Sequence, residues 1–237
     1  MDGIELAARF SYITNSLRFC GPEEASGQFL GYIASSTSAE SVKESLKKFE
    51  GLYPYLSVIA AKNKKEFTDY GVVEAYWIGN ELLDNMDSED IKSIIEKLMS
   101  RGLPKSIGHG LMKNLPDGMV PHHNFNVLYV GVGKTSGTVP TTIQNMDNCR
   151  ISMGKVIGFS GDNLIVQTDI LKSAGGKFLL QKNETKTAAY LKEMLPEVKM
   201  GDYVALHWGF ACMALNGIQR KNLEHYTNKI VHMLNIT

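Results

Sequence analysis

Cysteine is scarce in this chain of 237 residues, which has Cys20, Cys149 and Cys212, far apart in sequence. An odd number of widely spaced cysteines does not form a disulfide framework and is typical of free thiols in a reducing compartment. The chain also lacks a CxxC pair. The usual cysteine spacing of a structural zinc site is therefore absent.

Net charge is absent as well, because 25 Lys and Arg residues balance 25 Asp and Glu residues. Nucleic-acid binding rests on a basic surface, and attraction to an anionic membrane needs a polybasic segment, so we expect neither partner. No apolar run approaches the roughly 18 residues of a transmembrane helix. The first residues, MDGIE, lack the basic and apolar regions of a secretory signal. We therefore expect a cytoplasmic protein.

The first half of the chain has the periodicity of helices. Apolar residues between 91 and 98 recur at i, i+3, i+4 and i+7, which predicts a helix over 88–100 with Asp87 or Ser88 as its cap. Another helix is expected to begin at Ser41, which forms a capping-box pattern with Glu44, and to end at Gly51. Further helices are predicted at 7–17, 23–34 and 66–83.

The period changes in the second half. Residues 124–133 alternate polar and apolar side chains, with β-branched and aromatic residues among them, which predicts a strand. Further strands are predicted at 150–159, 164–169, 177–181 and 203–208, an insertion of helical character at 183–195, and an amphipathic helix from about Gly217.

Helices that precede strands indicate an α+β fold rather than a parallel βαβ sheet. The β part begins near residue 120 or near residue 145. We divide the chain into a helical domain, 1–120, and a β-rich domain, 121–237, that ends in a helix.

A Gly-rich segment, GVGKT at 131–135, is similar to the end of a phosphate-binding loop. Leu128 stands where that loop has a glycine, and the residues that follow do not predict the helix whose N-terminus would hold the phosphate. We expect a turn without a nucleotide.

His122 and His123 precede the predicted strand. Adjacent residues of a strand point to opposite faces, so both bind one ion only if they lie in a loop after Pro121. Imidazole titrates near neutrality and binds many metals, so each is a candidate ligand or acid–base group. His109, between two glycines, is a similar candidate. The alternative for all of them is a packed or solvated side chain.

Two of the cysteines have informative neighbours. Cys20 lies in a Phe-Cys-Gly-Pro turn before a predicted helix, whose amides would favour a thiolate, so it is either a ligand or reactive thiol or a buried small residue. Cys212 has apolar neighbours and is expected to be a core thiol.

Two segments carry a more specific pattern: CRISMGKV at 149–156 and GDYVALHWGFA at 201–211. In this order, and followed by a helix, they resemble the opening and closing strands of the HypC/HupF family of hydrogenase maturation chaperones. The core of the resemblance is 148–235, and the whole chain is similar to a prokaryotic group in which such a barrel follows a helical domain. A thiolate near the imidazole of His207 would suit iron, nickel or zinc.

The resemblance implies a small OB-like β-barrel with a C-terminal helix. It also implies that Cys149 is the thiolate that contacts a metal or a client, with His207 as its neighbour. Iron or nickel would be the metal, and a metalloenzyme precursor or another maturation protein the partner. Secondary candidates for contact are Cys20, His109, His122 and His123.

We therefore expect an accessory or maturation protein more than an enzyme. One alternative is a thiol enzyme with its site between the domains, in which Cys20 or Cys149 is the nucleophile and His122 or His123 the base. Another is a non-catalytic interaction module with buried thiols.

Overall fold

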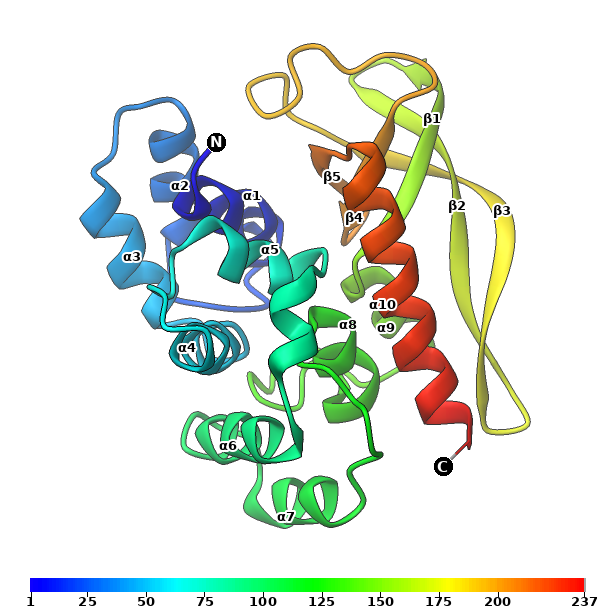
Figure 1. The fold of residues 1–237 in the computed structure, drawn as a ribbon. Helices are drawn as coiled ribbons and strands as arrows, with labels where there is room; N and C mark the ends of the chain where they lie inside the picture. The colour runs from blue at the N-terminus through cyan, green and yellow to red at the C-terminus, as the bar shows by residue number, and fades with distance from the viewer. Residues whose placement is uncertain (237) are drawn as a thin grey trace.

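The computed structural model describes residues 1–236, with helices on one side and a sheet on the other (Figure 1). Three short segments lead from the helices to the sheet: α8 (His123–Phe125), the π-helix η2 (Asn126–Gly131) and α9 (Ile143–Cys149). The preceding elements are α1 (Gly3–Ser16), α2 (Ala25–Ile33), α3 (Ala39–Lys47), α4 (Tyr53–Lys62), α5 (Tyr70–Trp77), the 3-10 helix η1 (Glu81–Asn85), α6 (Ser88–Met99) and α7 (Lys105–Lys113).

The sheet closes on itself in the order β1-β2-β3-β5-β4, so that its strands form a ring. Neighbouring strands are antiparallel, except that β3 and β5 meet in parallel at the single pair Ala189 and Phe210. The strands are β1 (Ser152–Ser160), β2 (Asn163–Ala174), β3 (Lys177–Ala189), β4 (Tyr203–His207) and β5 (Phe210–Ala214), and α10 (Gly217–Ile236) follows. The predicted α+β class is confirmed.

Helix α10 joins the sheet to the N-terminal helices (Figure 1). Its Tyr226 hydroxyl donates to the carbonyl of Asn80 at 2.8 Å, and the ring packs on Gly79, where any side chain would collide with it. At the other end, the Asn235 side chain binds the backbone of Phe178 in β3. One buried apolar cluster includes residues of both halves. The division at residue 120 stays a prediction.

Two helix starts test the predicted caps. Asp87 caps α6 as expected, because its Oδ1 accepts from the backbone of Glu89 and Asp90. The cap predicted at Ser41 is wrong: α3 begins earlier, and Ser38 accepts from the Ser41 amide at 3.3 Å. A residue whose side chain caps a helix typically has an extended backbone, and Ser38 does, with φ −72° and ψ 146°, whereas Ser41 lies within α3.

Two predicted elements of the second half are also wrong. Residues 124–131 are helical, in α8 and η2, and residues 132–133 form a turn, so the predicted strand at 124–133 is absent. Most of this segment is buried, and a short apolar run that is buried on several faces has the same composition in a helix and in a strand. The insertion expected at 183–195 is strand up to Ala189, because β3 pairs with β2 along its length.

The segment between η2 and α9 is the Gly-rich turn that the sequence predicts. No helix follows the GVGKT residues until Ile143. Gly133 has φ +74, and a Cβ at this position would collide with the carbonyl of Val139. The segment therefore lacks the helix N-terminus of a phosphate loop.

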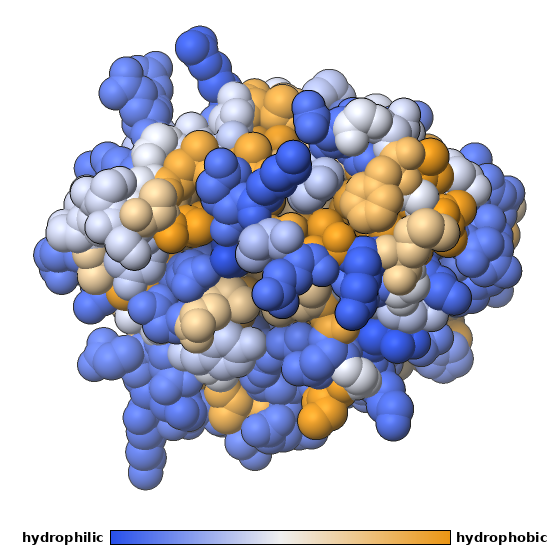
Figure 2. Space-filling view, turned by 90° about the horizontal axis from the view of Figure 1, so that it is seen from above, coloured by the Kyte–Doolittle hydropathy of each residue, from blue (hydrophilic) through white to orange (hydrophobic). Residues whose placement is uncertain are grey.

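Apolar side chains also reach the surface. Viewed from above, they lie in separate patches between polar residues (Figure 2). No helix within residues 1–236 combines the length and the apolar character needed to cross a membrane.

Candidate metal centre

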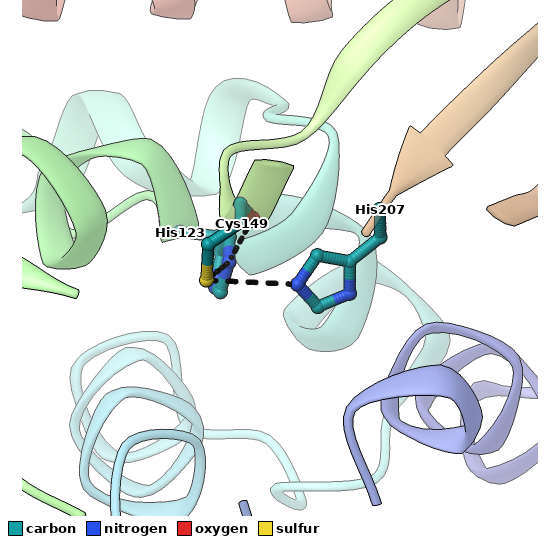
Figure 3. A group of neighbouring side chains, drawn as sticks. All are labelled: His123, Cys149 and His207. Atoms are coloured by element: carbon teal, nitrogen blue, oxygen red, sulfur yellow. Dashed lines mark hydrogen bonds between the residues drawn. The ribbon is translucent and has the colours of Figure 1, made fainter. Parts of the chain in front are cut away.

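Three side chains from distant parts of the chain meet between the helices and the sheet (Figure 3). They are His123 at the start of α8, Cys149 at the end of α9 and His207 at the end of β4. The sulfur of Cys149 lies 3.8 Å from Nε2 of His123 and 3.8 Å from Nε2 of His207. The three ligand atoms lie within 4.8 Å of one another, so this group could hold a metal ion.

A backbone carbonyl fixes the orientation of His207. Its Nδ1 lies 2.9 Å from the carbonyl oxygen of Phe10 in α1, which can only accept. Nδ1 of the neutral ring therefore carries the proton, and Nε2 presents a lone pair toward Cys149. A histidine that ligates a metal is commonly held in this way by its other nitrogen.

His123 has contacts at both ring nitrogens. Nδ1 lies 2.9 Å from the Tyr76 hydroxyl, and Nε2 lies 3.0 Å from the carbonyl oxygen of Cys149. The Tyr76 hydroxyl has one proton, which it donates to the carbonyl of Gly51 at 3.0 Å. If that bond is kept, Nδ1 of His123 donates to Tyr76 and Nε2 carries no proton. In the other tautomer Tyr76 donates to Nδ1, and Nε2 donates to the carbonyl of Cys149. A metal at Nε2 requires the first tautomer.

Burial sets the protonation of the cluster. It lowers the pKa of His207 to about 4 and the pKa of His123 well below its ordinary value. It also raises the pKa of the Cys149 thiol well above its ordinary value. Removal from water disfavours every charged form, so the unliganded cluster holds two neutral imidazoles and a thiol.

Aromatic rings enclose the cluster. Trp77 stacks on Phe10 at 5.0 Å between ring centroids and lies 4.5 Å from the His123 ring and 5.5 Å from the His207 ring. Such surroundings keep water away and strengthen electrostatic interactions within the site.

A small cavity of about 60 Å³ opens beside the sulfur. Its walls include residues of the Gly-rich turn and of the loop after α1, and Thr138 links these two segments by donating to the carbonyl of Phe19 at 2.6 Å. Residues of the cavity wall that carry its chemistry are Cys20, Trp77, His123, Cys149, His207 and Trp208.

Cys20 lies in the wall of this cavity but outside the group of three ligands. Burial, with a further contribution from Glu50, raises its pKa to about 12. The thiolate that a nearby helix start would favour is not expected here, because α2 begins only at Ala25. Cys20 is thus a protonated thiol that faces the same space as Cys149.

The remaining histidine candidates lie elsewhere. The Nδ1 of His122 accepts from the Asn124 amide at 3.0 Å, and its ring stacks with Tyr226, away from the cluster. Burial lowers the pKa of His122 to about 3. His109 is exposed on α7. Cys212 is a buried thiol in β5, as predicted.

Sequence reasoning paired Cys149 with His207 and left His123 as a secondary candidate. It missed the supporting partners Tyr76, Trp77 and the Phe10 carbonyl. A backbone carbonyl carries no sequence signal, and adjacent aromatic residues in a helix are ordinary core residues.

None of the curated proteins and none of the solved structures compared with the chain matches it. A family model does match, over residues 1–237. The chain therefore belongs to the group described as "Family of unknown function (DUF6390)".

Proposed function

We propose that the protein binds one transition-metal ion through His123, Cys149 and His207. The observation that carries this proposal is the distance of 3.8 Å from the Cys149 sulfur to each Nε2 atom. An ion with sulfur at about 2.3 Å and nitrogen at about 2.0–2.1 Å holds these atoms roughly 3.6 Å apart at a tetrahedral angle and roughly 3.8 Å apart at a trigonal one. The two sulfur–nitrogen distances would need little change. The same ion would hold the two nitrogen atoms roughly 3.3–3.6 Å apart, and the ligand atoms of the group lie within 4.8 Å of one another.

One thiolate and two imidazoles form a donor set of borderline softness. Such sets hold zinc, copper, iron or nickel, whereas magnesium and calcium prefer oxygen ligands. The resemblance to the HypC/HupF family favours iron or nickel. Three protein ligands leave at least one coordination position free, unlike the closed four-ligand sites that only stabilise a fold. The cavity beside Cys149 offers room for that further ligand.

The role that fits this site is that of an accessory or maturation protein that holds a metal for, or binds, a metalloenzyme precursor. Two observations support it. Cys149 and His207, on which the resemblance rests, are in contact although 58 residues separate them. The ring of strands followed by α10 also has the element order expected of an OB-like barrel with a C-terminal helix.

A thiol enzyme is the second candidate, and the observation that favours it is the contact between Cys149 and two imidazoles. Burial of the site argues against a thiol enzyme, because burial raises the pKa of Cys149 and lowers the pKa of His123. An activated cysteine needs the opposite shifts. A bound metal would displace the thiol proton, so the metal site fits these shifts better.

Metal analysis of anaerobically purified protein tests the proposal. Wild-type protein should carry close to one equivalent of iron, nickel, copper or zinc, and Cys149→Ala should lose it. Cys212→Ala is the matched control, because it removes a buried thiol that lies outside the group of three ligands. It should keep the metal.

Two results would contradict the metal site. One is wild-type protein that remains metal-free after reconstitution with each ion. The other is equal metal content in Cys149→Ala and wild type. Metal-free protein in which Cys149 reacts rapidly with alkylating reagents at neutral pH would instead favour the thiol enzyme.

A further inference from the structure

A second cavity lies on the other side of residues 149–151. It has a volume of about 170 Å³ and is enclosed by β1, β2, β3 and α10. Its walls are more polar than those of the cavity beside Cys149. Residues that define its chemistry are Arg150, Lys155, Asp169, Lys182, Glu224 and Thr227.

Arg150 is the central residue of this cavity. It is only 3% exposed, and its Nε and Nη2 donate to Asp147 Oδ1 at 3.1 and 2.9 Å. Nη2 also donates to the carbonyl of Asp169. Nη1 has no acceptor among residues 1–236. A buried guanidinium that lines a cavity with one donor nitrogen free is able to bind an acceptor there.

Thr227 supplies a second donor. It is 6% exposed, and its Oγ1 accepts from the Asn124 side chain at 2.9 Å. The hydroxyl proton has no acceptor in the described part of the chain. Both residues line the cavity, so these two donors are able to bind water or a ligand with acceptor oxygens there.

The charges around the cavity favour an anion. Asp147 is shared by Arg150 and by Lys186, whose Nζ lies 2.6 Å from it. Lys182 is paired with Asp169 at 2.7 Å. Lys155 and Glu224 are exposed at the cavity and balance each other. Of the charged residues that line the cavity, three are cations (Arg150, Lys155 and Lys182) and two are carboxylates (Asp169 and Glu224), so the cations outnumber the carboxylates by one.

We propose that this cavity is a binding site for a small oxyanion, a carboxylate or a phosphate, held by Arg150 and Thr227 with Lys155 at the rim. Its volume lies below the roughly 300 Å³ at which pockets for drug-sized ligands begin, so the ligand is a small ion or metabolite. A planar guanidinium suits both kinds of anion.

The anion site lies back to back with the metal site. Arg150 follows Cys149 in the chain, and Asn124, which follows His123, donates to Thr227 and to the carbonyl of Ile151. Arg150 is thus adjacent in sequence to the metal ligand Cys149, and Thr227 is hydrogen-bonded to the residue that follows the metal ligand His123. The anion site does not depend on the metal, so its test uses metal-free protein.

Thermal unfolding of chelator-treated, full-length protein tests the site. Sodium phosphate and sodium succinate are compared with sodium chloride at equal ionic strength and pH, and calorimetry gives the dissociation constants. At least one oxyanion should raise the unfolding temperature in a concentration-dependent manner, because a ligand that binds only the folded state stabilises it. The anion that does so identifies the class.

Matched lysine variants separate a site from general screening. Lys155→Gln should weaken binding roughly threefold to tenfold, because a charge-assisted contact is lost. Lys172→Gln removes an exposed strand lysine that does not line the cavity, and it should bind like wild type. Thr227→Val should also weaken binding, while Asn124 keeps its bond to Ile151.

Two results would overturn the anion site. One is that neither oxyanion raises the unfolding temperature beyond the chloride control. The other is that the two lysine variants weaken binding equally. Loss of metal binding in a separate experiment would leave this result unchanged, so the two proposals can fail independently.

Discussion

The buried side chains of the two cavities that flank residues 149–151 differ in charge. On one side, Cys149 and its histidines are surrounded by aromatic rings, and burial keeps them uncharged by shifting each pKa. On the other side, Arg150 is equally buried but remains paired with Asp147. The comparison shows that adjacent residues can place an uncharged group of potential metal ligands on one side and a buried charge on the other, provided that the buried charge has a partner.

The largest effect is expected on the charged side. Asp147→Ala leaves Arg150 buried without its carboxylate and also removes the acceptor of the Leu171 amide at 2.7 Å. Breaking a buried pair in this way costs about 3–5 kcal/mol. Urea unfolding should show the loss.

Asp162→Ala is the control for that variant, because Asp162 is exposed in the turn between β1 and β2. It should change stability by less than about 0.5 kcal/mol. Similar losses in the two variants would show that Arg150 does not depend on Asp147.

The buried histidines, which are neutral in the folded protein, should make the metal-free protein sensitive to acid. Burial lowers the pKa of His207 from 6.5 to about 4 and that of His122 from 6.5 to about 3. Between pH 6.5 and about 4 the unfolded chain therefore binds more protons than the folded one. Stability is full above pH 6.5 and falls with decreasing pH, by up to roughly 1.4 kcal/mol per pH unit for each histidine.

Urea unfolding at several pH values in this window measures that slope. His207→Asn should reduce it, whereas His109→Asn, at an exposed position, should leave it unchanged. An identical slope in His207→Asn and wild type would mean that His207 does not titrate on unfolding as its burial implies.

The smallest effect is expected at the support of His123. Tyr76→Phe removes the hydroxyl that contacts Nδ1 of His123 and that donates to Gly51. We expect metal affinity to fall roughly tenfold, the lower end for loss of such a partner, and stability to fall by about 1 kcal/mol.

Competition with a chromogenic chelator measures the affinity. Tyr12→Phe is the matched control, because Tyr12 packs on Phe210 through its ring and its hydroxyl has no hydrogen bond within residues 1–236. If both variants bind metal like wild type, the contact between Tyr76 and His123 does not tune the site.

The elements that the sequence predicted correctly are those with a local signal. Periodicity and capping predicted α6, and alternation predicted parts of each of the first four strands, because these signals are local. Residues 124–133 were assigned wrongly because a buried segment has no polar face to define its period. His123 was left as a secondary candidate because strand geometry next to the predicted strand would point His122 and His123 to opposite faces. As the first residue of α8, His123 instead reaches Cys149.

The contacts that complete both cavities are long-range. The Phe10 carbonyl lies 197 residues before His207, and Asn124 lies 103 residues before Thr227. No local pattern encodes such pairs. The polar cavity was not predicted at all, since Arg150 in sequence is an ordinary charged residue at the start of a predicted strand.

X-ray absorption at the metal edge of the loaded protein tests the central claim most directly. One sulfur at about 2.3 Å and two nitrogen ligands at about 2.0–2.1 Å are predicted, given a zinc-like ion. The sulfur contribution should vanish in Cys149→Ala and persist in Cys212→Ala. A metal shell made only of nitrogen and oxygen in wild-type protein would contradict the account.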